Sequence, residues 1–269
     1  MKNPPAILGE IASRTAIRVT KAKESLPPEQ AHERALALAA AQRGAQRPFP
    51  FERSLAAPGL SFICEVKKAS PSKGVIAQDF PWLQIAKEYE AGGASAISVL
   101  TEPEYFLGSD QYLQEIAATV QIPVLRKDFI IDTYQIYESK LLGAHAVLLI
   151  CALLDTETLS SFIAAADELA LDCLVEIHNE QEAEEALNAG ARIIGINNRD
   201  LTTFKVDTGL TSRLRKLIPS SVLAVSESGV KTKEDVGVLK ELNLDAVLIG
   251  ESLMRAADRT LFLKELLSV

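Results

Sequence analysis

A chain of 269 residues, 48% of them hydrophobic, is long enough for one large α/β barrel or for two ordinary domains. Its formal net charge of −8 disfavours nucleic acid or an acidic membrane surface as the main partner, but leaves open a local basic pocket for a phosphorylated metabolite. No apolar run approaches the roughly 20 residues of a membrane-spanning helix, so we expect no membrane partner.

The three cysteines, Cys64, Cys151 and Cys173, lie in or beside apolar segments. Since their number is odd, we expect reduced core side chains rather than a disulfide framework or metal ligands. The three histidines show no metal-binding spacing either. Residues 1–5 carry neither the apolar stretch nor the cleavage site of a signal peptide. We therefore expect a cytoplasmic protein with no metal site.

Residues 1–50 predict a helical extension in front of the main body. Isoleucine and leucine recur at helical spacing over 6–21, and 29–44 is rich in Ala, Leu and Glu. Leu26-Pro27-Pro28 ends the first helix and begins the second. Residues 48–54 lead into the first strand. Because this extension has no catalytic signature, we expect it to pack on the main body as a cap.

From residue 61 onward, short Val-, Ile- and Leu-rich strands alternate with Ala-, Glu- and Leu-rich helices. We predict strands at 61–67, 95–100, 123–127, 145–150, 172–177, 193–197, 222–226 and 245–250. We predict helices at 80–91, 109–119, 133–142, 156–170, 180–189, 207–217, 232–241 and 257–268. Eight such units over 61–269 indicate one α/β domain, a single closed (β/α)8 TIM barrel spanning residues 1–269 with its helical extension. An open, doubly wound sheet is the alternative.

The first strand carries charge where burial is expected. Alternation places Glu65 and Lys67 on one strand face, while the flanking residues on both faces are apolar. Buried charges are costly unless they are paired or used. Other predicted strands also end in polar side chains: Lys127, Glu176, Asn197 and Glu227. In a barrel the carboxyl ends of all strands meet at one face, so we expect these six residues to form one site.

The segments after the last two strands predict a phosphate site. Ser228 and Gly229 follow the seventh strand, and Gly250, Glu251 and Ser252 follow the eighth. Glycine allows close approach to the backbone, and N–H groups at a helix start bind anions. These are also the loops that hold phosphate in many such barrels. Ser70 and Arg199 could contribute from neighbouring loops.

Two lysines among several carboxylates suit proton transfer. The chain shows no Ser/His/Asp arrangement, cysteine nucleophile or dinucleotide fingerprint, which disfavours hydrolysis and hydride transfer. Schiff-base chemistry on Lys67 or Lys127 stays open, because burial could lower either pKa. Phe106 and Phe129 are expected to pack and also to wall a pocket. Asp128 and Asp200 are expected to brace loops.

The segment Glu-Val-Lys-Lys-Ala-Ser-Pro-Ser-Lys-Gly at 65–74 resembles the signature of the indole-3-glycerol-phosphate synthase family. Further matches follow in the same order: 98–102 with 105–108, 125–130, 175–179, 195–201, 226–230 and 250–254. The resemblance covers essentially the whole chain, including the helical front segment. It implies ring closure of 1-(2-carboxyphenylamino)-1-deoxyribulose 5-phosphate in tryptophan biosynthesis, with loss of carbon dioxide and water. It also implies that no metal or organic cofactor takes part.

The resemblance implies a role for each polar residue. Lys127 would be the general acid that protonates the ribulose carbonyl during ring closure. Lys67 would hold the substrate carboxylate and donate a proton during dehydration, and Glu65 would position it. Glu176 would be the base for the proton whose loss restores aromaticity. The remaining assignments are orientation by Asn197 and Glu227, a phosphate cradle of Ser228, Gly229, Gly250, Glu251 and Ser252, and a ring-binding wall of Phe106 and Phe129.

Two other interpretations of the sequence compete with this one. A lysine Schiff-base aldolase could use the same barrel, and a catalytically silent barrel could bind a phosphorylated ligand. The set of buried charges argues against a silent barrel, since a non-enzyme has no reason to keep it. We expect a monomer acting on a small phosphorylated molecule, with other tryptophan-pathway enzymes as candidate partners.

Overall fold

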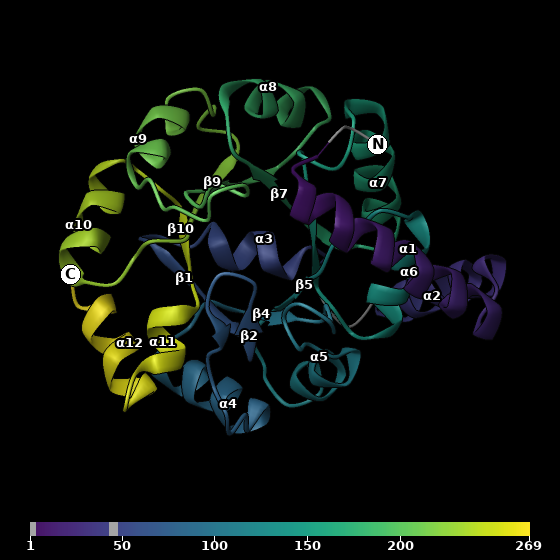
Figure 1. Ribbon diagram of the computed structural model, residues 1–269, viewed down its shortest axis with the longest axis horizontal. Coiled ribbons are helices and arrows are strands. Elements are labelled where there is room, and N and C mark those ends of the chain that lie inside the picture. The colour runs from purple at the N-terminus through teal and green to yellow at the C-terminus, as the bar shows by residue number, and fades with distance from the viewer. Residues whose placement is uncertain (1–3, 43–47) are drawn as a thin grey trace.

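The computed structural model describes residues 4–42 and 48–269, and its centre is a closed barrel of parallel strands (Figure 1). The strands follow one another around the barrel in the order β1-β10-β9-β8-β7-β6-β5-β4. Their bounds are β1 Ser61–Val66, β4 Ala96–Leu100, β5 Val124–Lys127, β6 Ala146–Ile150, β7 Asp172–Ile177, β8 Ile193–Asn197, β9 Leu223–Glu227 and β10 Ala246–Ile249. The predicted barrel is therefore confirmed, and the open sheet is wrong.

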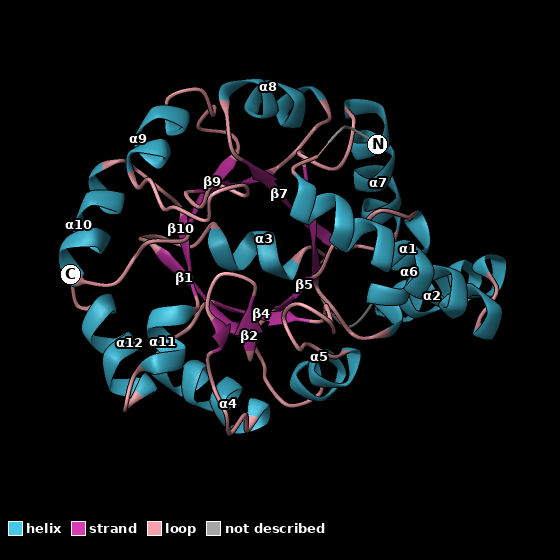
Figure 2. Cartoon of the chain, in the orientation of Figure 1, coloured by secondary structure: helices cyan, strands magenta, loops and turns pink. Residues whose placement is uncertain are grey.

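Helices surround the barrel and cover the outer face of its strands (Figure 2). They are α4 Trp82–Gly92, α5 Asp110–Ala117, α6 Thr133–Leu141, α7 Thr156–Glu168, α8 Glu180–Asn188, α9 Gly209–Arg215, α10 Lys233–Glu241, α11 Glu251–Arg255 and α12 Arg259–Leu267. Because helices cover one face and side chains fill the interior, most strand residues are buried on both sides. Each fully buried Leu, Ile or Val in this core stabilises the fold by roughly 1.5–3 kcal/mol.

The N-terminal segment forms α1 (Ala6–Ser25), α2 (Pro28–Gln42) and the short α3 (Pro50–Leu55). Helix α1 runs four residues beyond its predicted end, and residues 43–44 of the second predicted helix lie outside the described residues. Helix α2 packs against α6. The segment was expected to pack on the main body as a cap. It does so, and α1 in addition lines the main cavity.

Helix α3 lies across the amino-terminal end of the barrel, where sequence patterns predicted only a lead-in to the first strand. Phe51 and Leu55 are fully buried there. The N–H groups of Phe51 and Glu52 donate to Oδ2 of Asp172, the first residue of β7, at 3.0 and 3.1 Å. These bonds occupy N–H groups that a helix start leaves free. With this end closed, only the carboxyl ends of the strands are left for a ligand.

Two other elements were not predicted, and both lie near the carboxyl ends of the strands. Helix α11 follows β10 directly and has only 5 residues. Strands β2 (Ala69–Ser70) and β3 (Gly74–Val75) form a small antiparallel hairpin after β1.

The predicted reduced state of the cysteines is matched by three free, buried thiols. No helix among residues 4–42 and 48–269 is long and apolar enough to span a membrane.

Candidate active site

A cavity of about 790 Å³ opens at the carboxyl ends of the barrel strands. All of the predicted site residues contribute to its lining: Glu65, Lys67, Ser70, Phe106, Lys127, Phe129, Glu176, Asn197, Arg199, Glu227, Ser228, Gly229, Gly250, Glu251 and Ser252. The topology explains this, because strands far apart in sequence end at one rim. Ile7, Leu8 and Ile11 of α1 also line the cavity, so the helical extension forms part of its wall.

Lys127, the last residue of β5, lies between two carboxylates on the cavity floor. Its Nζ is 3.2 Å from Glu176 Oε2 and 3.2 Å from Glu227 Oε2. Burial alone would lower the pKa of Lys127, but Glu227 and Glu176 outweigh it and hold that pKa well above its usual value. Lys127 is therefore an ammonium at neutral pH. This charge state disfavours a Schiff base, which requires the neutral amine.

The two carboxylates beside Lys127 differ in charge state. Burial raises the pKa of Glu227 to about 7 against the opposing charge of Lys127. Burial would also raise the pKa of Glu176, but Lys127 and His178 outweigh it and hold that pKa well below its usual value. Glu176 thus stays ionised, and Glu227 is the first of the pair to take a proton. Opposite environments of this kind are how enzymes separate an acid from a base.

Glu65 and Lys67 form a second ion pair on β1 and just beyond it. Lys67 Nζ donates to Glu65 Oε1, and both side chains are largely buried. A Cβ added at Gly250 would overlap Glu65 Oε1 and lie 3.0 Å from Lys67 Nζ. Gly195 on β8 has the same relation to Glu227, since a Cβ there would overlap Glu227 Oε1. Both glycines therefore leave room for buried carboxylates, which is a reason for glycine besides turn geometry.

Asn197 connects the acid–base set to the loop after β9. Its Oδ1 accepts the Arg199 N–H at 3.0 Å and the Ser228 hydroxyl at 2.9 Å. Ser228 and Gly229 both have left-handed backbone conformations, with φ of 67° and 100°. A serine there is strained, and the bond from Asn198 Nδ2 to the Ser228 carbonyl helps to hold it. The loop is thus fixed before any ligand binds.

The candidate phosphate region also includes the start of α11. The Ser252 hydroxyl donates to the Val230 carbonyl at 2.9 Å and ties this start to the loop after β9. The Glu251 carboxylate lies 3.7 Å from Lys73 Nζ and 3.2 Å from Arg255 Nε. The Glu251 side chain is thus paired with two cationic side chains, and Glu251 could bind an anion only through its backbone N–H. Arg199 Nη1 donates to the Phe204 carbonyl.

Phe106 and Phe129 form an aromatic wall with ring centroids 6.0 Å apart. Glu102 holds the backbone that carries Phe106 by accepting the N–H groups of Glu104, Tyr105 and Phe106 at 2.7–3.0 Å. Phe129 follows Asp128, whose carboxylate accepts the Phe129 N–H at 2.8 Å. The prediction that Asp128 braces a loop is therefore confirmed, and both rings sit on braced backbone.

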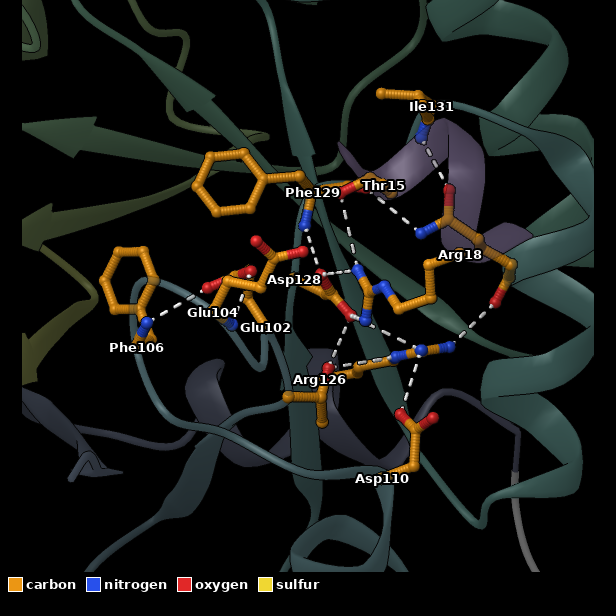
Figure 3. A network of polar contacts seen from close by, with 12 residues as sticks. Thr15, Arg18, Glu102, Glu104, Phe106, Asp110, Arg126, Asp128, Phe129 and Ile131 are labelled. Atoms are coloured by element: carbon orange, nitrogen blue, oxygen red, sulfur yellow. Dashed lines mark hydrogen bonds and ion pairs between the residues drawn. The ribbon is translucent and has the colours of Figure 1, made fainter. Parts of the chain in front are cut away.

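No sequence pattern indicated the contacts that join Asp128 to the helical extension (Figure 3). Arg18 of α1 donates to both Asp128 oxygens, at 2.9 and 2.8 Å. Thr101 donates to the same carboxylate at 2.6 Å, and the fully buried Arg126 pairs with Asp128 and Asp110. Burial would raise the pKa of Asp128, but Arg126 and Arg18 outweigh it and lower that pKa. Helix α1 is thus fixed to the residue that directly follows strand β5.

Asp200 accepts the N–H groups of Thr202 and Thr203 at 3.0 and 2.6 Å, so its predicted role in bracing a loop is confirmed. Within the part of the chain that the structure describes, no cluster of three or more His, Cys, Asp or Glu side chains could hold a metal ion.

Comparisons with known proteins agree on one family. The model of the family "Indole-3-glycerol phosphate synthase" matches residues 8–266. An indole-3-glycerol phosphate synthase of Ruminiclostridium cellulolyticum is 55% identical over 94% of this chain and 95% of its own length. One of Endomicrobium trichonymphae is 53% identical over 97% of this chain and 99% of its own length.

Solved structures with low sequence identity share the fold. A 3-hexulose-6-phosphate synthase aligns with a TM-score of 0.62 at 15% identity, covering 78% of this chain and 99% of that one. The structure titled KGPDC from Streptococcus mutans aligns with a TM-score of 0.62 at 10% identity, covering 78% and 96%. At such identity these likenesses support the barrel fold and carry no argument about the reaction.

Proposed function

The chain belongs to the indole-3-glycerol phosphate synthase family of carboxy-lyases, and on that premise we propose how its residues divide the work of ring closure. The enzyme converts 1-(2-carboxyphenylamino)-1-deoxyribulose 5-phosphate into indole-3-glycerol phosphate, carbon dioxide and water. The observation that carries the proposal is the Lys127 ammonium, held 3.2 Å from each of two buried carboxylates on the cavity floor.

Lys127 is proposed as the general acid of the first step. The ring carbon that bears the carboxylate attacks the ribulose carbonyl carbon, and a proton passes from Nζ to the carbonyl oxygen. That oxygen would otherwise become an alkoxide, which is far more basic than an amine, so even a firmly held ammonium donates to it. The Glu176 and Glu227 carboxylates then face a neutral amine. General acid catalysis of this kind contributes typically 10²–10⁴-fold.

Glu176 is proposed as the base of the last step. Carbon dioxide leaves first, the hydroxyl then leaves as water with a proton from Lys67, and one further proton must be lost to form the aromatic indole. Before the reaction, Lys127 holds the pKa of Glu176 well below its usual value. Once Lys127 has given up its proton, that restraint weakens, so the affinity of Glu176 for a proton rises when a base is needed.

The remaining residues are proposed to bind and orient the substrate. Lys67, kept charged by Glu65, would hold the anthranilate carboxylate before it leaves as carbon dioxide. The aromatic wall of Phe106 and Phe129 would enclose the ring. Asn197 and Glu227 would orient hydroxyls of the ribulose chain. The phosphate would lie against a last group of residues: Ser70, Arg199, Ser228, Gly229, Gly250, Glu251 and Ser252.

The enzyme acts on a small phosphorylated molecule in tryptophan biosynthesis, and we propose that it does so in the cytoplasm, as a single-domain monomer without a metal or organic cofactor. The three free, buried cysteines suit a reducing compartment. Sedimentation at micromolar concentration tests the monomer, and a dimer would contradict this part of the proposal.

The direct test is a fluorescence assay for indole-3-glycerol phosphate with purified enzyme in the presence of a chelator. We expect turnover without added metal, and a requirement for metal would overturn the proposed mechanism. Borohydride added during turnover should trap no adduct on Lys67 or Lys127, whereas a trapped adduct would support the Schiff-base alternative. Substrate binding without turnover would indicate a silent barrel.

A further inference from the structure

His178 lies one residue beyond β7 and contacts carboxylates on both sides of its ring. Its Nε2 is 3.3 Å from Glu176 Oε1, the oxygen that Lys127 does not contact. Its Nδ1 is 3.2 Å from Oε2 of Glu182 on α8. The His178 side chain is only 12% exposed and that of Glu182 only 11%. Glu176 therefore has one cation at each of its oxygens.

Glu182 is fixed by the start of α8, and this fixes the imidazole in turn. The Glu182 carboxylate accepts the His178 N–H at 2.8 Å and the Asn179 side-chain amide at 2.9 Å. Asn179 in return caps the helix by accepting the Glu182 N–H at 2.9 Å. Such reciprocal bonds at a helix start are a rigid local arrangement. Nothing in this arrangement requires the substrate to be bound.

The carboxylates around His178 determine its charge. Burial would lower its pKa, but Glu176 and Glu182 outweigh it and raise the pKa of His178 to about 10. Asp200, from the loop after β8, also interacts with His178: hydrogen bonds from Thr203 chiefly lower the Asp200 pKa, and the imidazolium adds a smaller lowering. His178 is thus an imidazolium at neutral pH: its Nδ1 is hydrogen-bonded to Glu182, and its Nε2 forms an ion pair with Glu176.

We propose that His178, held by Glu182, is a positioning residue that orients the Glu176 carboxylate and keeps it ionised while Lys127 gives up its proton. This proposal rests on the role of Glu176 as the base. When Lys127 becomes neutral, His178 is the cation that still faces Glu176. One Glu176 oxygen then stays on the imidazolium, and the other, released from the ammonium, points to the substrate.

The test is a set of single substitutions assayed across pH. His178→Gln keeps an amide donor but removes the charge, and Glu182→Gln leaves the imidazole less firmly held. We expect kcat to fall about 10- to 100-fold for His178→Gln, as when an orienting partner is removed, with KM nearly unchanged. The acid limb of the kcat profile should move to higher pH by about one unit or more, because removing a cation raises the pKa of Glu176.

Glu180→Gln is the matched control, since it removes the same charge from the first turn of α8, whereas the carboxylates that contact His178 are Glu176 and Glu182. It should leave kcat and the acid limb unchanged. The proposal is overturned if the limb stays in place in both test variants, even where kcat or the melting temperature falls, because a merely structural role predicts that result.

A readout without substrate separates this proposal from the proposed function. In ¹⁵N NMR of the wild-type enzyme, the His178 ring should stay protonated on both nitrogens at pH 8, and in Glu182→Gln it should titrate at lower pH. A ring that is neutral at pH 8 in the wild type would overturn the positioning role. Wild-type enzyme without synthase activity, but with a protonated ring, would instead contradict the proposed function.

Discussion

Replacing Lys127 with methionine tests the proposed general acid with the least change in shape. Methionine has similar length but cannot donate a proton. Because proton donation contributes typically 10²–10⁴-fold, we expect Lys127→Met to lower kcat by about 10²–10⁴-fold. The phosphate region lies on other strands, so binding of the product should weaken far less. The prediction therefore separates catalysis from binding.

The same substitution has a stability effect that follows from the burial of its partners. Breaking a buried ion pair costs roughly 3–5 kcal/mol when it leaves a charge unpaired. Here the cost should be lower, about 2 kcal/mol at pH 7, because Glu227, with a pKa already raised to about 7, can take up a proton. His178 also remains 3.3 Å from Glu176. Urea denaturation at pH 7 measures this loss.

The stability of the fold should fall as Glu176 is protonated at low pH. The pKa of Glu176 lies below its unfolded value, so it contributes stability above about pH 4.5 that is lost as the pH falls further. Lys127 causes much of that lowering, so Lys127→Met should lose less stability than the wild type between pH 5 and 3.

The decisive assay for the role of Lys127 is single-turnover formation of indole-3-glycerol phosphate, followed by fluorescence. A variant with wild-type kcat would refute the role of Lys127.

Other substitutions probe further parts of the site. Glu176→Gln should lower kcat by at least about 10²-fold while changing KM little, as steady-state kinetics would show. Arg18→Gln should destabilise the fold by about 2 kcal/mol in urea, because it leaves the buried Asp128 with Arg126 as its remaining cation. Gly195→Ala should lower kcat with a folded barrel, because the added Cβ overlaps a Glu227 oxygen.

Matched controls exist for two of these variants. Arg14 lies on the same helix as Arg18 and forms an exposed ion pair with Glu104. Because exposed pairs contribute little to stability, Arg14→Gln should leave the urea midpoint unchanged. Equal losses for the two arginines would contradict the importance of the buried pair. Gly237→Ala adds a Cβ in α10 where its nearest neighbour would be 3.9 Å away, so kcat should not change. A loss of kcat there would make the Gly195 result uninformative about Glu227.

The barrel was predictable because its signals are local and repeated. Each predicted strand boundary agrees with the structure to within one residue, since apolar segments of four to six residues alternate with helical ones. Helix α11 was missed because 5 residues show no helical period. Helix α3 was missed because its burial depends on the barrel end rather than on its own pattern.

The site was predictable only as a set of residues at strand ends. Topology alone implied that Lys127 and Glu176 would meet, although 49 positions separate them. The contact of Arg18 with Asp128 spans 110 positions and has no local signal, so no sequence pattern could have indicated it. His178 was different, because its partner Glu182 is four residues away, at the start of a predicted helix capped by Asn179. Capping rules could have found that pair.

The buried charged side chains on the cavity floor are tolerated because their charges balance. Glu65, Glu176 and Glu227 outnumber Lys67 and Lys127, and a substrate that brings a carboxylate and a phosphate would add to the excess. Glu227 relieves this excess, because its pKa of about 7 lets it bind a proton at neutral pH. Every other charge on the floor then has an opposite partner, and this satisfies the condition under which buried ions persist. The ionised Glu176 and the protonated Lys127 are therefore consequences of one arrangement, in which each charge favours the other and His178 is a second cation beside Glu176.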